Sequence, residues 1–386
     1  MVPSKHRVTT RIRRGTVAMF VTAVSLFTIS YTPAFAVTTP ASTLTAGWLA
    51  AQVGTDGAVN VPGETFSATT QTMYVAQGLA ATGQQRAALA RAMGYIALHA
   101  EEWITNDGSG ATVAPSGSDL PERLGSLILL VNTVGGDPRS FGIPAIDLVA
   151  RVQALYGIAT PGFYGFEEPY SAVQDQSLVV MALKAIGASV PVAAVQWIVD
   201  QQCLGGTNPA SSLGGWMASR TATGGVLNNC TAPNALNYTG ADTNSTAFAL
   251  QALAYFGTSG PLAAGLDFLR SSQTTTGPQA SGFPWFAGGD PDPNSTALVL
   301  QALIAAGQSP AGGSWSVNGV SPDSVLTSWQ LTSPAADAGS LYAAWQPGVP
   351  SLLATYQGLW GLTLTAFPFP VLPPIVPEVT PPTFTG

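Results

Sequence analysis

The sequence predicts an all-α fold, an α6/α6 toroid in which six inner helices form a ring inside six outer helices. Three observations predict it: a repeated inner segment, amphipathic segments between the repeats, and a composition rich in small residues. The clearest repeat is the pair 242–257, DTNSTAFALQALAYFG, and 292–307, DPNSTALVLQALIAAG. Two such similar segments in one chain indicate a structural unit that is used more than once.

Weaker copies of this segment extend the repeat along the chain. Each copy is apolar and rich in small residues, and the copies end at Gly83, Gly135, Gly187, Gly257, Gly307 and Gly361. The steps between these glycines are 52, 52, 70, 50 and 54 residues, which predicts six repeats. The segments are apolar nearly all round, which is typical of helices buried on both faces.

A second set of segments lies between the first, and each of them is amphipathic. Apolar residues recur at i, i+3, i+4 and i+7, the pattern of a helix that covers a core on one side. These segments span 42–52, 85–104, 144–157, 191–202, 260–273 and 322–331. Their alternation with the apolar set predicts the inner and outer rings, and glycine ends each inner helix.

The first 36 residues are predicted to be a secretory signal peptide outside the fold. Basic residues between Lys5 and Arg14 precede the apolar run 15–30, which leads to Ala34 and Ala36. This order is typical of a signal cleaved after Ala36. An uncleaved anchor is the alternative, but the run is shorter than the roughly 20 residues that span a bilayer. We therefore expect a secreted or cell-surface protein.

Charge argues against nucleic acid as a partner. Five of the 13 Lys and Arg residues lie in the predicted signal, which leaves 8 basic and 20 acidic residues, a net charge of −12. A surface with this charge repels phosphate backbones.

The remaining chain is expected to form a toroid over 37–365, followed by a tail over 366–386. The long repeat step contains Cys203 and Cys230. An oxidising compartment favours their pairing, so we expect an insertion at about 203–240 held by its own disulfide. Two separate thiols are the alternative. The tail is rich in proline and is expected to be an extended spacer.

These repeats resemble the α/α toroid superfamily of squalene-hopene cyclases, protein prenyltransferase β subunits and cobalamin carriers. DTNSTA and DPNSTA are similar to its inner-helix openings. The connectors of that superfamily contain an aromatic residue, then a glutamine, then a glycine followed by an aromatic residue. This chain has the same order at Trp197, Gln201 and Gly215-Trp216, and at Phe268, Gln273 and Gly282-Phe283. The resemblance covers about residues 40–365 and implies a fold without identifying a function.

The catalytic sets that the resemblance implies are incomplete. A terpene cyclase of this type protonates its substrate with an Asp-x-Asp-Asp motif, but residues 292–295 read DPNS. Asp292 is therefore a weak candidate for a catalytic acid. Prenylation needs a zinc ligand set, and after the signal the chain has one histidine, His99, and two cysteines expected to be paired. We expect no metal site, identify no cofactor, and favour a protein that is not an enzyme.

The expected functional site is a polar rim at one mouth of the toroid. The inner helices should run parallel, so their N-termini surround one mouth and present free N–H groups. The candidate ligand-binding residues, at these openings and in overhanging loops, are Gln71, Gln174, Asp175, Asp242, Asn244, Asp292, Asn294, Tyr356, Gln357, Tyr164, Trp216 and Trp285. Helix capping alone is the plainer interpretation of each Asp and Asn.

Such a rim suits a polar or amphipathic small molecule. The cobalamin carriers hold a corrinoid at this mouth and cover it with a second domain. The resemblance therefore implies a corrinoid or isoprenoid ligand, and a cell-surface or lid-domain protein as a partner. A terpene cyclase or prenyltransferase with a divergent acid, and a structural or adhesive surface module, are the alternatives.

Overall fold

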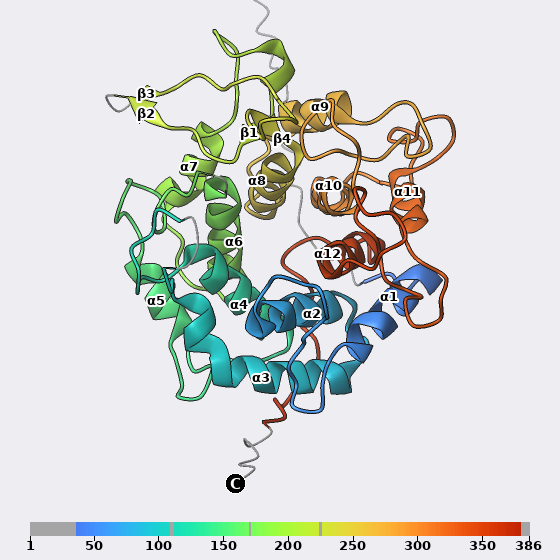
Figure 1. The fold of residues 1–386 in the computed structure, drawn as a ribbon. Helices are drawn as coiled ribbons and strands as arrows, with labels where there is room; N and C mark the ends of the chain where they lie inside the picture. The colour runs from blue at the N-terminus through green and yellow to red at the C-terminus, as the bar shows by residue number, and fades with distance from the viewer. Residues whose placement is uncertain (1–35, 109–111, 170, 224–225, 380–386) are drawn as a thin grey trace, which may run out of the picture.

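The computed structural model describes residues 36–108, 112–169, 171–223 and 226–379. All of the predicted signal peptide except Ala36 lies outside the described residues. The α6/α6 toroid is confirmed, since the helices of the described residues alternate between an inner and an outer ring (Figure 1). None of these helices is long and apolar enough to cross a membrane.

The inner and outer helices follow the two predicted sets of segments. The inner ring comprises α2 (Ala68–Thr82), α4 (Pro121–Thr133), α6 (Ala172–Ala185), α8 (Thr243–Tyr255), α10 (Pro293–Ala305) and α12 (Leu352–Leu362). The outer ring comprises α1 (Pro40–Ala51), α3 (Arg86–Ile104), α5 (Leu148–Ala154), α7 (Val192–Asp200), α9 (Leu262–Ser272) and α11 (Pro322–Ser328).

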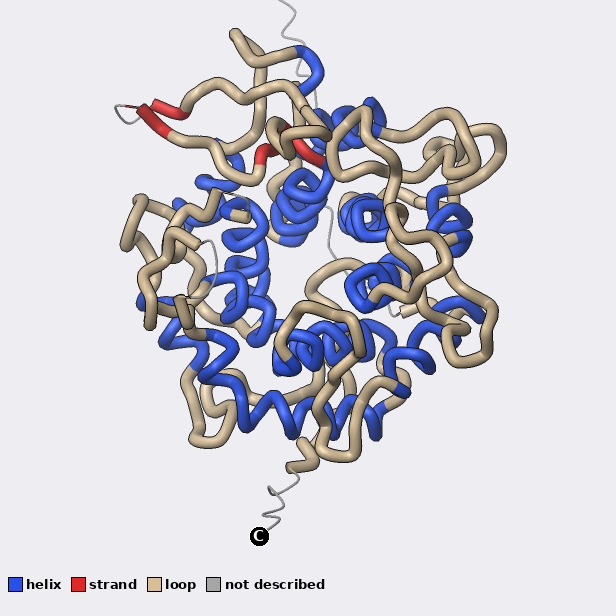
Figure 2. The backbone as a smooth tube through the Cα atoms, viewed as in Figure 1, coloured by secondary structure: helices blue, strands red, loops and turns tan. Residues whose placement is uncertain are grey.

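The few strands are short and lie in or beside the predicted insertion (Figure 2). β1 (Trp216–Met217) pairs with β4 (Ala241–Asp242), and β2 (Ala222–Thr223) pairs with β3 (Val226–Leu227), both antiparallel. Cys203 and Cys230 form a disulfide across this segment, as predicted. The bond closes a loop whose ends are 27 residues apart, which limits the unfolded conformations of the insertion.

A buried hydrogen bond joins five inner helices to the connector that precedes each of them. The donors are the backbone N–H groups of Val59, Tyr164, Trp216, Phe283 and Leu341. The acceptors are the side-chain oxygens of Thr72, Gln176, Thr246, Thr296 and Thr355, at 2.9–3.1 Å. The Thr of the repeated NSTA motif therefore has a structural role, because a buried backbone N–H without a partner is costly.

This bond places the connector's aromatic side chain between the two rings. Tyr164 is 1 % exposed, and Trp216 and Phe283 are 0 % exposed. The indole Nε1 of Trp216 donates to the carbonyl oxygen of Ile198 at 2.7 Å. These positions correct the expectation that Tyr164 and Trp216 overhang the mouth, since both side chains pack in the core.

Two of the glycines at which the repeated segments end, Gly83 and Gly361, have different roles in the structure. Gly83 follows α2 with φ 66°, a left-handed conformation that favours glycine. Gly361 instead lies inside α12, where an added Cβ would be 2.8 Å from Cα of Ala297 in α10. Its lack of a side chain therefore permits close contact between two inner helices, and the expected helix stop is absent there.

The tail over 366–379 packs on the toroid, which differs from the expected extended spacer. Phe367 and Phe369 are buried, and the N–H of Phe367 donates to Oε1 of Gln251 in α8 at 3.0 Å. Farther on, the N–H of Leu372 donates to the carbonyl oxygen of Thr133, and that of Glu378 to Ala90. Aromatic residues between the prolines give this segment apolar surface to bury, which explains its packing.

The connector hydrogen bond can be tested with Thr246→Val, which keeps the shape of the side chain and removes the hydroxyl. The buried N–H of Trp216 then loses its acceptor, so the free energy of unfolding should fall by about 1–3 kcal/mol. Thr43→Val on the exposed face of α1 is the control and should change stability little. Equal small effects of both substitutions in urea unfolding would remove the structural role given to this bond.

Packing of the tail can be tested with Gly94→Ala in α3. An added Cβ at Gly94 would be 2.0 Å from the carbonyl oxygen of Glu378, so the tail must move. Gly47→Ala in α1 is the matched control, because nothing lies within 4 Å of its added Cβ. Gly47→Ala should stabilise the helix by up to about 1 kcal/mol. Gly94→Ala should not stabilise the protein in this way, and it should make the tail more sensitive to limited proteolysis. Equal stabilisation by the two substitutions would contradict the packing of the tail on α3.

Candidate functional site

The inner ring is open along one seam. Neighbouring inner helices pack closely all round the ring, except that α2 and α4 have few contacts with each other. The helix α4 beside the seam also differs from the other inner helices at position 124. In α2, α6, α8 and α10, the residue whose side chain accepts the connector bond lies 11 residues before the glycine that ends the repeated segment. In α4 the residue at this distance before its glycine is Leu124. A leucine side chain cannot accept that hydrogen bond.

Two pockets occupy this seam and share Trp103 and Glu122 in their walls. The first, which we call the barrel cavity, has a volume of about 150 Å³ and lies among α2, α4, α6, α8 and α12. The second, the mouth pocket, has a volume of about 500 Å³ and lies over the N-termini of α2, α4 and α6. A molecule entering at the mouth pocket therefore meets the barrel cavity beneath it.

Aromatic side chains form a continuous wall from the mouth pocket to the floor of the barrel cavity. The ring of Phe66 meets the edge of Tyr74 at a centroid distance of 5.4 Å, and Tyr74 stacks on Tyr356 at 4.3 Å. Tyr356 meets Trp360 at 5.0 Å, and Trp360 meets Phe367 of the tail at 5.1 Å. The packed tail thus supplies part of the floor of the cavity.

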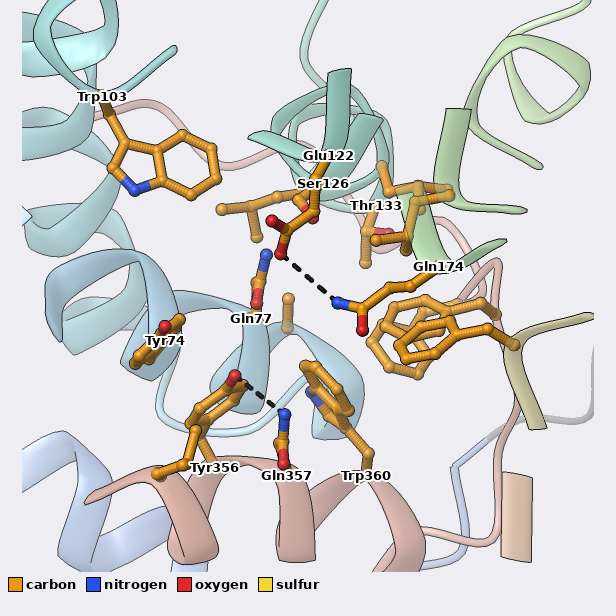
Figure 3. A pocket seen from close by; sticks show the side chains of 18 residues that line it. Tyr74, Gln77, Trp103, Glu122, Ser126, Thr133, Gln174, Tyr356, Gln357 and Trp360 are labelled. Carbon is orange, nitrogen blue, oxygen red and sulfur yellow. Dashed lines mark hydrogen bonds between the residues drawn. The ribbon is translucent and has the colours of Figure 1, made fainter. Parts of the chain in front are cut away.

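Polar side chains lie on two sides of the barrel cavity: Glu122 and Gln174 meet on one side, and Gln357 lies between Tyr356 and Trp360 on the other (Figure 3). Nε2 of Gln174 donates to Oε1 of Glu122 at 3.4 Å, which links α6 to α4. Nδ2 of Asn294 donates to Oε1 of Gln357 at 2.7 Å, and Nε2 of Gln357 donates to the Tyr356 hydroxyl at 3.1 Å. This second chain of bonds leaves the proton of the Tyr356 hydroxyl available to a ligand.

Two acidic side chains in the seam favour their neutral forms. Burial raises the pKa of Glu122, and Arg123 and the hydrogen bond from Gln174 oppose the rise. Burial, followed by the nearby Glu122 carboxyl, raises the pKa of Asp175 well above its ordinary value. Burial also raises the pKa of Tyr74 to about 12, and Glu122 adds to this rise. Burial in the seam therefore disfavours the charged forms of these side chains.

Three buried polar atoms in the walls have no hydrogen-bond partner within the described part of the chain. They are Nε1 of Trp103, Nε1 of Trp360 and Oδ1 of Asp175. The exposed fractions of these residues are 6 %, 4 % and 2 %. Buried polar atoms are normally paired, so a molecule bound in the seam could supply partners for these three.

Four of the predicted residues come together in the seam, and three others lie elsewhere on the mouth face. Gln174, Tyr356 and Gln357 line the barrel cavity, and Asp175 lines the mouth pocket. Asn294 reaches the site through its bond to Gln357. Asp292 and Trp285 line a separate hollow, and Asn244 lies at the start of α8, where its Oδ1 accepts from the Thr243 hydroxyl at 3.4 Å.

Three predicted residues have structural partners for their side chains. Gln71 bonds to the backbone of Val61 and Phe66 and so holds the loop before α2. Asp242 is the N-cap of α8, and both of its carboxyl oxygens accept from Ser245. Asp292 makes the same two bonds to Ser295. Burial raises the pKa of each of these carboxyls to about 6, against the hydrogen bonds from serine.

Several cavity residues lie outside the set predicted from the sequence. Ser126 and Leu129 in α4 line the barrel cavity one and two turns after Glu122, which lies at a helix opening where the polar rim was expected. Tyr74 and Gln77 in α2 line it from the other side of the seam. A polar residue one or two turns inside an apolar helix was the signal available, because it identifies the side of the helix that faces the centre of the ring.

No protein-family model matches the chain, and no curated protein matches it. Solved structures do match in fold. An unsaturated glucuronyl hydrolase specific for heparin is 14 % identical, with a TM-score of 0.54 over 84 % of this chain and 95 % of that one. The unsaturated glucuronyl hydrolase of Bacillus sp. GL1, responsible for degradation of glycosaminoglycan, is 10 % identical, with a TM-score of 0.55 over 85 % and 98 %.

A type II terpene cyclase from Scytonema, MstE, is 12 % identical to this chain, with a TM-score of 0.49 over 84 % and 95 % of the two chains. The fold that this chain shares with the glucuronyl hydrolases agrees with the predicted α/α toroid. At such low identity the likeness shows the fold alone, and the function must be argued from the site.

The buried acid of the mouth pocket predicts a pH-dependent effect of Asp175→Asn. Because the pKa of Asp175 is raised in the folded protein, its contribution to stability is present at low pH and is lost as pH rises through the raised pKa. An asparagine side chain does not ionise, so Asp175→Asn removes this loss of stability at higher pH. The variant should therefore gain stability over the wild type as pH rises above about 4, by about 1.4 kcal/mol for each unit of the pKa shift.

Unfolding of both proteins in urea across this pH range measures the difference. Asp267→Asn, on the exposed side of α9, is the matched control. A pH-independent effect of Asp175→Asn would mean that this carboxyl is not held in its neutral form by burial.

Proposed function

We propose that this toroid binds a small amphipathic molecule, with its polar head in the mouth pocket and its apolar part in the barrel cavity. The group of unpaired buried polar atoms in the two pockets carries the proposal. Acceptors on the ligand would pair with the indole N–H groups of Trp103 and Trp360. A donor on the ligand would pair with Oδ1 of Asp175.

The polarity of the two pockets supports an amphipathic ligand. Glu122 and Gln174 lie near the mouth pocket, where helix N-termini also present N–H groups. Phe248, Phe367 and Phe369 surround the deeper part of the barrel cavity. Burying the apolar part of a ligand among these rings would contribute about 25 cal/mol for each Å² removed from water, and the polar head would set its orientation.

Charge and size distinguish between the classes of ligand. The mouth pocket contains Glu102, Asp107 and Glu168 in addition to the two buried carboxyls, with Arg123 as the one basic residue in its wall. This balance disfavours an anionic head such as a diphosphate, so an isoprenoid with a neutral head fits better. A corrinoid macrocycle exceeds the 150 Å³ of the barrel cavity and would have to lie across the mouth pocket. Its outer face would then need a lid-domain partner.

Export of the protein is part of the proposal. It rests on the order of basic, apolar and small residues in the first 36 residues and on the disulfide between Cys203 and Cys230. Binding outside the cytoplasm would suit a carrier that captures its ligand from dilute solution or passes it to a cell-surface partner.

A second candidate function is acid catalysis in the same cavity, favoured by the pair of Glu122 and Asp175. A carboxyl kept neutral by burial can donate a proton to an electron-rich bond in a bound substrate. Aromatic rings such as Tyr356 and Trp360 would stabilise a cation formed below it. Asp292, the acid singled out by the sequence, suits this role less well, because both of its oxygens accept from Ser295.

The binding proposal can be tested by filling the cavity with Ser126→Phe. We propose a thermal-shift screen of neutral isoprenoids, prenyl diphosphates and corrinoids, followed by titration of any hit through quenching of tryptophan fluorescence. Trp103 and Trp360 line the cavity and should report its occupancy. Ser126→Phe should lower the affinity at least tenfold, or by about 1.4 kcal/mol, because the added ring occupies the space of the ligand.

Ser324→Phe, on the exposed side of α11, is the matched control and should keep the wild-type affinity. Binding that survives Ser126→Phe unchanged would place the ligand outside the barrel cavity and overturn the proposal. Mass spectrometry of the same mixtures detects any product. Product that disappears in Glu122→Gln would support the second candidate function over simple binding.

A further inference from the structure

A separate hollow lies on the mouth face of the toroid, near the N-termini of α8 and α10. These helices stand across the ring from α2 and α4 (Figure 1). The hollow has a volume of about 250 Å³, and its aromatic lining consists of Tyr238, Trp285, Phe286 and Trp345. We call it the aromatic hollow. Three loops build it: the one before α8, the one between α9 and α10, and the one between α11 and α12.

The rings of the aromatic hollow are unusually exposed. Trp345 is 70 % exposed, Tyr238 57 % and Trp285 39 %, whereas Phe286 is buried at 4 % and forms the base. The ring centroids of Tyr238 and Trp285 lie 5.4 Å apart, and those of Trp285 and Phe286 lie 5.1 Å apart. A group of large aromatic faces left in contact with water indicates a binding surface, since burying them is favourable.

The loop that carries Trp285 is held in place by the first turn of α8. The N–H of Thr243 donates to the carbonyl oxygen of Trp285 at 2.9 Å, and the Thr243 hydroxyl donates to that of Pro284 at 2.7 Å. A ring on such a fixed backbone loses little conformational entropy when a ligand binds. The backbone that carries Trp285 is therefore held in place before a ligand binds.

We propose that the aromatic hollow binds a neutral saccharide. A pyranose ring has an apolar C–H face, which can stack on the faces of Trp285, Tyr238 or Trp345, and hydroxyl groups around its edge. The carboxyl of Asp290 lies in the wall of the hollow and can accept hydrogen bonds from such hydroxyls. Aromatic faces with a polar group beside them match both parts of the sugar.

Charge and size narrow the choice of occupant. Asp290 and the net charge of −12 after the predicted signal disfavour anionic saccharides such as sulfated glycans. A volume of 250 Å³ lies below the roughly 300–1,000 Å³ of pockets for drug-sized ligands, which suits one sugar ring of a longer chain. A stable protein interface instead buries about 800 Å² on each partner. A neutral glycan contacted through one ring fits the hollow best.

The aromatic hollow is separate from the ligand site proposed in the barrel cavity. The two share no lining residue, and the aromatic hollow is formed by loops while the cavity lies among inner helices. Saccharide binding at the hollow should therefore persist in Ser126→Phe, and the failure of one proposal does not entail the failure of the other.

The experiment titrates the full chain with the hexasaccharides of glucose in α-1,4 and β-1,4 linkage, of N-acetylglucosamine and of mannose, with heparin as the anionic comparison. Isothermal calorimetry up to millimolar concentration gives the affinities. At least one neutral hexasaccharide should bind and heparin should not. Trp345→Ala and Tyr238→Ala should each weaken binding by about tenfold, because each removes a stacking face.

Both substituted side chains are largely exposed, so the variants should fold. Val192→Ala, at a position 85 % exposed on α7, is the control and should bind as the wild type does. The proposal is overturned if no neutral hexasaccharide binds, or if Trp345→Ala and Tyr238→Ala leave the affinity unchanged. It is equally overturned if Trp345→Ala converts an oligomer to a monomer in size-exclusion chromatography, because the hollow would then be a contact between protein chains.

Discussion

The hydrogen bond between an inner-helix side chain and the N–H of the preceding connector is the interaction on which the toroid depends. It satisfies a backbone group that has no other partner at that depth, and it thereby buries the neighbouring aromatic ring between the two rings of helices. Glutamine side chains at the ends of outer helices then join successive repeats. Gln273 donates to the carbonyl oxygen of Trp315, and Gln330 donates to that of Ala41, which closes the circle between the last repeat and the first.

The cavity lies beside the one repeat that departs from this pattern. With Leu124 at the acceptor position, α4 lacks the bond that the other inner helices make within the described residues, and it packs sparsely on α2. The space between them is lined by polar and aromatic side chains, so it has not been filled by apolar packing. Burying Glu122 and Asp175 there disfavours folding at neutral pH, because their charged forms lose hydration. Perturbed acids and unpaired polar atoms of this kind gather at functional sites.

The tail contributes to the same site from the other end of the ring. Phe367 and Phe369 lie in the floor of the barrel cavity, and the segment beyond them runs beneath α3 and α4. Glycines at positions such as Gly94 allow the backbone of the tail to approach a helix closely. The floor of the cavity is thus formed by a segment whose composition alone resembles a linker.

The architecture could be predicted from the sequence because it depends on local periodicity. The terminal glycines, the apolar and amphipathic segments, and the Asp-x-x-Ser-Thr openings repeat in register, and each acts within a few residues of its own position. For the same reason Asp242 and Asp292 could be recognised as possible caps. The disulfide followed from the presence of just two cysteines in the one oversized repeat.

Only the tertiary structure decided which polar residues meet. Asp292, Asn244 and Glu122 all lie near helix openings in the sequence, but only Glu122 reaches the cavity, because the unequal spacing of α2 and α4 opens the ring there. Tyr164 and Trp216 were indistinguishable from mouth residues until the connector bonds placed them in the core. A repeat sequence determines each unit and its neighbours, whereas the position of a cavity depends on how contacts among distant segments, the tail included, differ around the closed ring.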